Sequence, residues 1–101
     1  MREYYYIMNE RKEMVPVDVT TWKRWFENKE GRIVAYDDFG DVRVSTVALG
    51  LDHSNGIGEP QLFETMVFGG PLDDQMERYA TFWQAKEGHE RMVKRVRQAS
   101  E

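Results

Sequence analysis

The chain has 101 residues and no cysteine, and it carries a formal net charge of −4 at pH 7. This length allows one domain, the lack of cysteine excludes disulfides, thiolate metal sites and cysteine nucleophiles, and no apolar run is long enough to span a membrane. Residues 37–77 carry nine acids against Arg43 alone, so this acidic middle argues against a nucleic-acid partner and leaves a basic protein, a cation or simple solvation as alternatives.

Hydrophobic periodicity and turn residues divide the chain into six elements in the order β-α-β-β-β-α. We expect strands at 4–8, 32–37, 42–51 and 61–68, helices at 20–28 and from 82 onward, and loops at 9–14, 52–60 and 72–79. Consecutive strands joined as hairpins pair antiparallel, so the sequence predicts a single α+β domain over residues 1–101 with a sheet of about four strands. A sheet face that no helix covers would be covered by a partner subunit.

The first helix has capping residues and one apolar face. Its N-cap candidates precede an i, i+3, i+4 pattern of large apolar residues. The capping candidates are Asp18, Thr20 and Thr21, and the apolar residues are Trp22, Trp25 and Phe26. Gly31 is expected to end the helix, because glycine readily adopts the left-handed conformation found at helix C-termini.

The strand at 42–51 changes its apolar face along its length. Val42 and Val44 alternate on one face, whereas Val47 and the two leucines that follow fall on the other. Either both faces are covered or a bulge lies near Ser45 and Thr46. A hairpin loop of four or five residues is expected before this strand.

The last helix carries the strongest local signals. Thr81 and Gln84 match a capping box, in which each side chain accepts a hydrogen bond from the other residue's backbone N–H. One apolar stripe follows, made of Phe82, Ala85, His89, Met92, Val96 and Ala99. Gly88 costs about 1 kcal/mol relative to alanine in mid-helix, so we expect the helix backbone to lie close to the sheet there.

Two polar residues lie within apolar surroundings. Glu64 shares a strand face with Leu62, Met66 and Phe68, and His89 lies inside the stripe of the last helix. Because a buried polar group is costly unless it is hydrogen-bonded, we predict a Glu64–His89 pair between sheet and helix. The alternative is that Glu64 lies at an edge and reaches water.

The loop after the long strand is the predicted place for a ligand pocket. Asp52 and His53 end that strand, where a rigid element holds residues at a flexible rim. A pocket is expected where this loop meets the connection at 69–79, which supplies Arg78 as a base and Tyr79 as an aromatic ring. The candidate ligand-binding residues are His53, Arg78, Asp52, Tyr79, Glu64 and His89.

The sequence contains no motif for catalysis or for a cofactor. The glycine pairs open no capped helix and no nucleophile motif occurs. Asp52, His53, Glu64 and His89 have the ligand chemistry of a zinc or manganese site, but their spacings match no metal motif. We therefore expect no metal and no cofactor and favour a non-enzymatic protein. The alternative is a small metal-assisted hydrolase that uses His53, Glu64 and His89.

Several segments together resemble a family of small uncharacterised proteins of bacteriophages and prophages. The segments are Trp22–Phe26, Val44–His53, Phe63–Gly70, Arg78–Thr81 and Gly88–His89. The resemblance implies a phage-encoded protein of the host cytoplasm, and small phage proteins without catalytic motifs are often inhibitors of host defence or sponges for a signalling nucleotide. The expected partner is a host protein or a small host-derived ligand, and a virion component is a further alternative. Apolar surface left over by the many aromatic residues also predicts a homo-oligomer, most simply a dimer.

Overall fold

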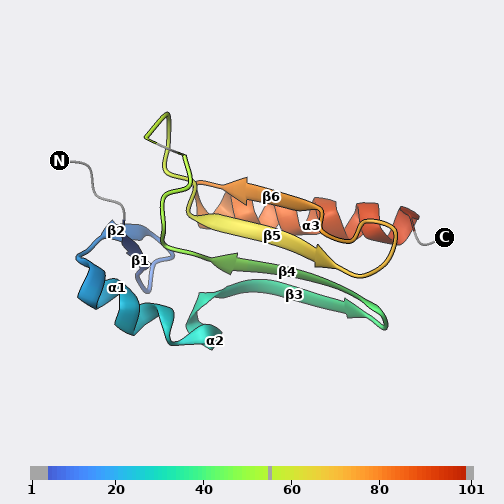
Figure 1. Cartoon of the computed structure of the whole chain (residues 1–101), viewed down its shortest axis with the longest axis horizontal. Coiled ribbons are helices and arrows are strands. Elements are labelled where there is room, and N and C mark those ends of the chain that lie inside the picture. Colours follow the sequence, from blue (N-terminus) through green and yellow to red (C-terminus); the bar gives the residue numbers. More distant parts are fainter. Residues whose placement is uncertain (1–4, 55, 100–101) are drawn as a thin grey trace.

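A computed structural model describes residues 5–54 and 56–99. Within these residues the chain forms two antiparallel sheets and three helices (Figure 1). The elements are β1 Tyr6–Met8, β2 Met14–Pro16, α1 Val19–Phe26, α2 Lys29–Arg32, β3 Ile33–Phe39, β4 Val42–Ala48, β5 Phe63–Phe68, β6 Met76–Tyr79 and α3 Phe82–Ala99. The predicted α+β class is confirmed, although the order of strands and helices differs in detail.

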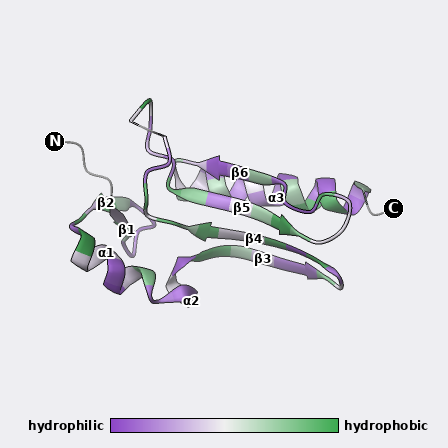
Figure 2. Ribbon diagram, in the orientation of Figure 1, coloured by the Kyte–Doolittle hydropathy of each residue, from purple (hydrophilic) through white to green (hydrophobic). Residues whose placement is uncertain are grey.

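The main sheet has the strand order β3-β4-β5-β6, and each neighbouring pair is antiparallel. The α3 helix lies along one face and contacts all four strands (Figure 1). The buried strand residues beneath it are Val42, Val44, Thr46, Ala48, Phe63, Thr65, Val67 and Tyr79. Apolar and polar residues alternate along α3 (Figure 2), and its apolar stripe closes this core.

The β4 strand is regular, so the alternative of a bulge near Ser45 and Thr46 is wrong. Its buried residues alternate without interruption, and Thr46 is one of them. The apparent change of face arises because a threonine replaces an apolar residue on the buried side while Val47 lies on the opposite side. The register irregularity of this hairpin instead lies in β3, between Ile33 and Ala35.

The hairpin turn and two short strands also differ from the prediction. Phe39 pairs with Val42, so the loop has two residues in place of four or five, and Gly40 takes the positive φ of 72° that the tight turn requires. The β6 strand lies within the predicted loop at 72–79, and the β2 strand, which was not predicted, begins at the last residue of the predicted loop at 9–14. Each has only three or four residues, which is too short for a period-two pattern to show in the sequence.

The first helices end differently from the prediction. Asp18 caps α1 by accepting a 2.8 Å hydrogen bond from the Thr21 backbone N–H, and hydrogen bonds from the side chain and the backbone of Thr21 lower the pKa of the Asp18 carboxyl. The helix ends at Phe26, before Gly31, so the predicted stop at that glycine is wrong. Gly31 lies within α2, whose first turn is capped by the Asn28 side chain.

The β1–β2 hairpin and α1 pack against one end of the main sheet (Figure 1). The Tyr6 backbone N–H donates to the Gly50 carbonyl at 2.8 Å, and the Trp22 indole N–H donates to the Leu49 carbonyl at 3.1 Å. A Cβ on Gly50 would overlap the Tyr6 carbonyl and the rings of Trp22 and Trp25, and its φ is 68°. Glycine is therefore required where the two parts of the molecule join. Within the described residues, no helix is long and apolar enough to cross a membrane.

Candidate functional site

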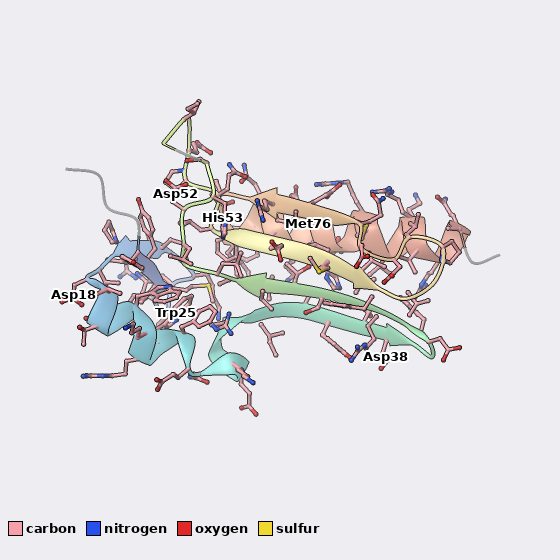
Figure 3. All side chains as sticks on the ribbon, viewed as in Figure 1. Asp18, Trp25, Asp38, Asp52, His53 and Met76 are labelled. Carbon is pink, nitrogen blue, oxygen red and sulfur yellow. The ribbon has the colours of Figure 1, made fainter. Side chains whose placement is uncertain are left out.

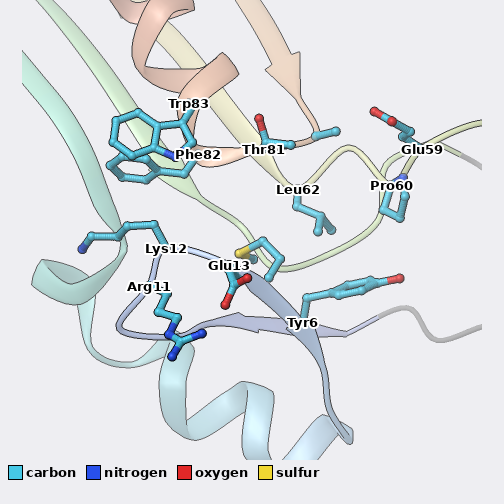
Figure 4. Close-up of a pocket in the computed structure, with 12 residues that line it drawn as sticks. Tyr6, Arg11, Lys12, Glu13, Glu59, Pro60, Leu62, Thr81, Phe82 and Trp83 are labelled. Carbon is cyan, nitrogen blue, oxygen red and sulfur yellow. The ribbon is translucent and has the colours of Figure 1, made fainter.

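A cleft of about 490 Å³ opens between the tip of the β1–β2 hairpin and the start of α3 (Figure 4). The third wall is the end of the loop that leads into β5. The apolar lining residues are Tyr6, Met14, Pro60, Leu62, Phe82 and Trp83. This volume lies within the range of small-molecule sites, which are mostly apolar with a few polar groups.

The hairpin tip holds its charged residues in a defined conformation. The Asn9 carboxamide oxygen accepts hydrogen bonds from the backbone N–H groups of Arg11 at 2.9 Å and of Glu13 at 3.0 Å. Lys12 between them has a φ of 65°, which is unusual for a residue with a side chain. This local bonding turns the tip toward α3 and brings the Lys12 amine to 5.6 Å from the centre of the Phe82 ring.

The opposite wall is formed by two aromatic residues at the start of α3. The predicted capping box is confirmed: the Gln84 backbone N–H donates to the Thr81 hydroxyl, and the Thr81 backbone N–H donates to the Gln84 carboxamide, each at 3.2 Å. This cap positions Phe82 and Trp83, whose rings meet edge to face at 5.0 Å. Trp83 is 63% exposed, so its position is not explained by core packing.

Three of the four charged residues that line the cleft, Arg11, Lys12 and Glu13, lie at the hairpin tip. Glu59 lies at the other end, beside Pro60 (Figure 4). Glu13 adds a second carboxylate and accepts a 3.2 Å hydrogen bond from the Asn9 amide. Two bases and two acids balance, so the cleft favours a ligand with little net charge and an anionic group at the hairpin end.

A second group of polar side chains forms a row beneath α3. His89 Nδ1 lies 2.7 Å from the Thr46 hydroxyl, and its Nε2 lies 2.7 Å from the Asp37 carboxylate. The Thr46 hydroxyl also bonds to that of Thr65. The Thr65 side chain bonds in turn to Tyr79, and burial raises the pKa of the Tyr79 phenol to about 12.

This row has the residue types of a nucleophilic triad, but it is closed to substrate. A catalytic hydroxyl must meet the atom that it attacks, and Thr46 is 0% exposed while His89 is 3% exposed. The row is therefore structural: its polar side chains form hydrogen bonds with one another inside the core. Gly88 makes room for it, because a Cβ there would overlap the Tyr79 ring, and the predicted close approach of helix and sheet is confirmed.

The predicted Glu64–His89 pair is wrong, because the two residues lie on opposite faces of the sheet. Glu64 instead accepts a 3.2 Å hydrogen bond from the Arg78 guanidinium, its neighbour across β5 and β6. Its side chain remains 17% exposed on the face that α3 does not cover. The alternative, a Glu64 at a sheet edge, is also wrong, because β5 is an inner strand of the sheet.

The two segments of the predicted pocket meet only in part. The turn at 69–75 lies at the far end of β5 from the loop at 52–60 (Figure 1). The end of the connection at 69–79 returns to that loop, so that Arg78 and Tyr79 border a hollow together with Glu59. Asp52 and His53 lie at the base of the first loop (Figure 3). The Asp52 carboxylate accepts backbone N–H bonds from Ser54 at 2.8 Å and Gln61 at 3.3 Å, which closes the loop.

Of the six predicted ligand-binding residues, two border a hollow. Arg78 and Tyr79 line a polar hollow of about 360 Å³ between β6 and α3, together with Arg91. None of the six lines the larger cleft. The residues that do line it give a weak sequence signal, since the hairpin tip reads as a polar turn and Phe82 reads as part of the apolar stripe of the helix.

No metal site is formed by the residues that the structure describes, in which no three His, Asp or Glu side chains are placed to hold an ion together. Comparisons with protein-family models, with curated proteins and with solved structures find no match for this chain.

Proposed function

We propose that this chain is a non-catalytic binding protein whose cleft takes a small ligand with a planar apolar body and one anionic group. The observation that carries the proposal is the exposed Trp83 ring, which meets the partly buried Phe82 ring edge to face, with Lys12 across the 490 Å³ cleft. An exposed tryptophan held by a capped helix start adds nothing to the core, whereas such rings stack well on planar ligands.

The charges of the cleft narrow the ligand class. An anionic group at the hairpin end would lie near Arg11 and Lys12, and the planar body would lie against the aromatic pair. Glu13 and Glu59 would repel a ligand with several negative charges. A nucleoside monophosphate or a cyclic nucleotide fits this description better than a triphosphate does.

The resemblance to phage proteins supports a biological setting for such binding. A small protein of this kind would lower the free concentration of a host-derived nucleotide in the host cytoplasm, and it would act as a sponge. The alternative hydrolase that uses His53, Glu64 and His89 has less support, because Glu64 and His89 are on opposite faces of the sheet.

The test is calorimetric titration of the protein with AMP, cyclic AMP and ATP, followed by the same titration of two variants. We expect Trp83→Ala to weaken binding of AMP or cyclic AMP at least about tenfold, as expected for loss of one stacked ring. Tyr36→Ala removes an aromatic ring of similar exposure from the open sheet face and should leave binding unchanged.

Three outcomes would overturn the proposal. The first is that neither AMP nor cyclic AMP binds at millimolar concentration. The second is equal binding by the wild type and Trp83→Ala. The third is conversion of the bound nucleotide to product, with or without added zinc or manganese, which would contradict a non-catalytic role.

A further inference from the structure

The face of the main sheet opposite α3 has an apolar centre that no described element covers. Strand register places Tyr36, Ser45, Met66 and Met76 side by side in one row across all four strands. Tyr36 is 51% exposed and Met76, labelled in Figure 3, is 41% exposed. Large apolar side chains gathered on one sheet face are typical of an interface.

The charges that flank this row balance. Asp38 and Arg43 are register partners on one side, and Glu64 and Arg78 are partners on the other. The face is therefore neutral, although the whole chain carries −4. A second copy of the chain could approach this face without the repulsion that the rest of the surface would exert.

The size of the face is sufficient for a weak dimer. Four strands about 4.8 Å apart and three rows about 6.8 Å apart give a flat area of about 400 Å². With the relief of the side chains, two copies would bury about 1,000 Å² in total, which is at the lower limit for specific interfaces.

We propose that a second copy of this chain packs on the open face, with a two-fold axis parallel to the strands. This axis places β3 over the partner's β6 and β4 over the partner's β5, so that Tyr36 faces the partner's Met76. Arg43, whose guanidinium lies 5.5 Å from the Phe68 ring centre within one chain, would also face the partner's Phe68. This proposal does not depend on the ligand cleft, which lies elsewhere.

The experiment is sedimentation velocity of the full chain from about 1 to 200 μM, the range in which an interface of this size dissociates. Wild type should shift from a 12.0 kDa monomer to a dimer. Met66→Glu places two carboxylates near the axis and should raise the dissociation constant about 100-fold or more. Trp83→Glu makes the same charge change at an exposed aromatic residue outside the face and should dimerise like wild type.

A second measurement uses the wild type alone, so it does not depend on how a variant folds. Peroxide oxidation of Met76 should slow as the protein concentration rises, whereas oxidation of Met14, outside the face, should not change. A wild type that stays monomeric throughout, a Met66→Glu variant that dimerises like wild type, or a Met76 oxidation rate independent of concentration would each overturn the proposal. A dimer unaffected by Met66→Glu would point to pairing through another surface, such as the sheet edge at β3 or at β6.

Discussion

Replacing Thr46 by valine should lower the free energy of unfolding by about 2 kcal/mol, because it leaves His89 Nδ1 buried without a partner. The imidazole is 3% exposed, so water cannot substitute for the lost hydroxyl. Replacing His89 by leucine should cost less, about 1 kcal/mol. In that variant the Thr46 hydroxyl keeps its bond to Thr65, and Asp37, whose side chain is 45% exposed, is hydrated.

The double variant should show strong coupling between the two positions. Once His89 is leucine, the valine at 46 leaves no imidazole unpaired, so the double variant should resemble His89→Leu. The coupling energy is then about 2 kcal/mol, well above the 0.5 kcal/mol or so of independent sites. Urea denaturation of the wild type, both single variants and the double variant measures it.

A second cycle provides the control. Glu64→Met combined with His89→Leu should be additive to within about 0.5 kcal/mol, because these residues lie on opposite faces of the sheet. Additivity in the Thr46–His89 cycle, or coupling in the Glu64–His89 cycle, would refute the placement of His89 against Asp37 and Thr46.

Three other predictions concern single residues. Gly88→Ala should lower the melting temperature. The added methyl group would overpack against the Tyr79 ring at a cost of about 1–3 kcal/mol, which exceeds the gain in helix propensity of about 1 kcal/mol. A variant more stable than wild type would exclude that contact. Burial raises the pKa of Tyr79 to about 12, so the neutral phenol stabilises the fold; this contribution is complete below pH 10 and is lost as the pH rises through 12. Tyr79→Phe should therefore lose less free energy of unfolding than wild type between pH 8 and 11.5, as measured by urea denaturation. An equal dependence of that free energy on pH in the two proteins would argue against this role of Tyr79. Arg32→Met should lower the free energy of unfolding by about 2 kcal/mol, since the guanidinium donates to the carbonyls of Phe26 at 2.9 Å and Ala48 at 3.1 Å. A melting temperature equal to that of wild type would show that this link between α1 and β4 is not needed.

Local sequence signals predicted the elements whose stability is mostly local. The last helix was predicted from its capping box and apolar stripe, and both are confirmed because helix caps involve residues three or four apart. The residues of β5 that share a face were also predicted, since the alternation of side chains along a strand follows from backbone geometry alone. Glu64 does share a face with Met66 and Phe68.

Short elements were missed because their stability comes from their partners. The β6 strand has four residues and exists because β5 offers it an antiparallel edge. The β2 strand depends in the same way on β1. Gly31 was read as a helix stop, but the Asn28 cap begins a new turn there. Such choices depend on neighbours that a local pattern does not contain.

The same limit explains the error over Glu64 and His89. Alternation divides a strand into two faces, but it does not say which face a helix will cover. The buried face contains Thr46 and Thr65, and the open face contains Val47. The apolar residues of the strands therefore favoured burial of the face that is open in the structure. The sequence by itself determined the α+β class, the long helix and the two faces of each strand. Only the packing of α3 decided which face of the main sheet is buried. A residue is buried only when a second surface packs against its own, so the polar residues on the covered face form hydrogen bonds with partners across the helix–sheet contact.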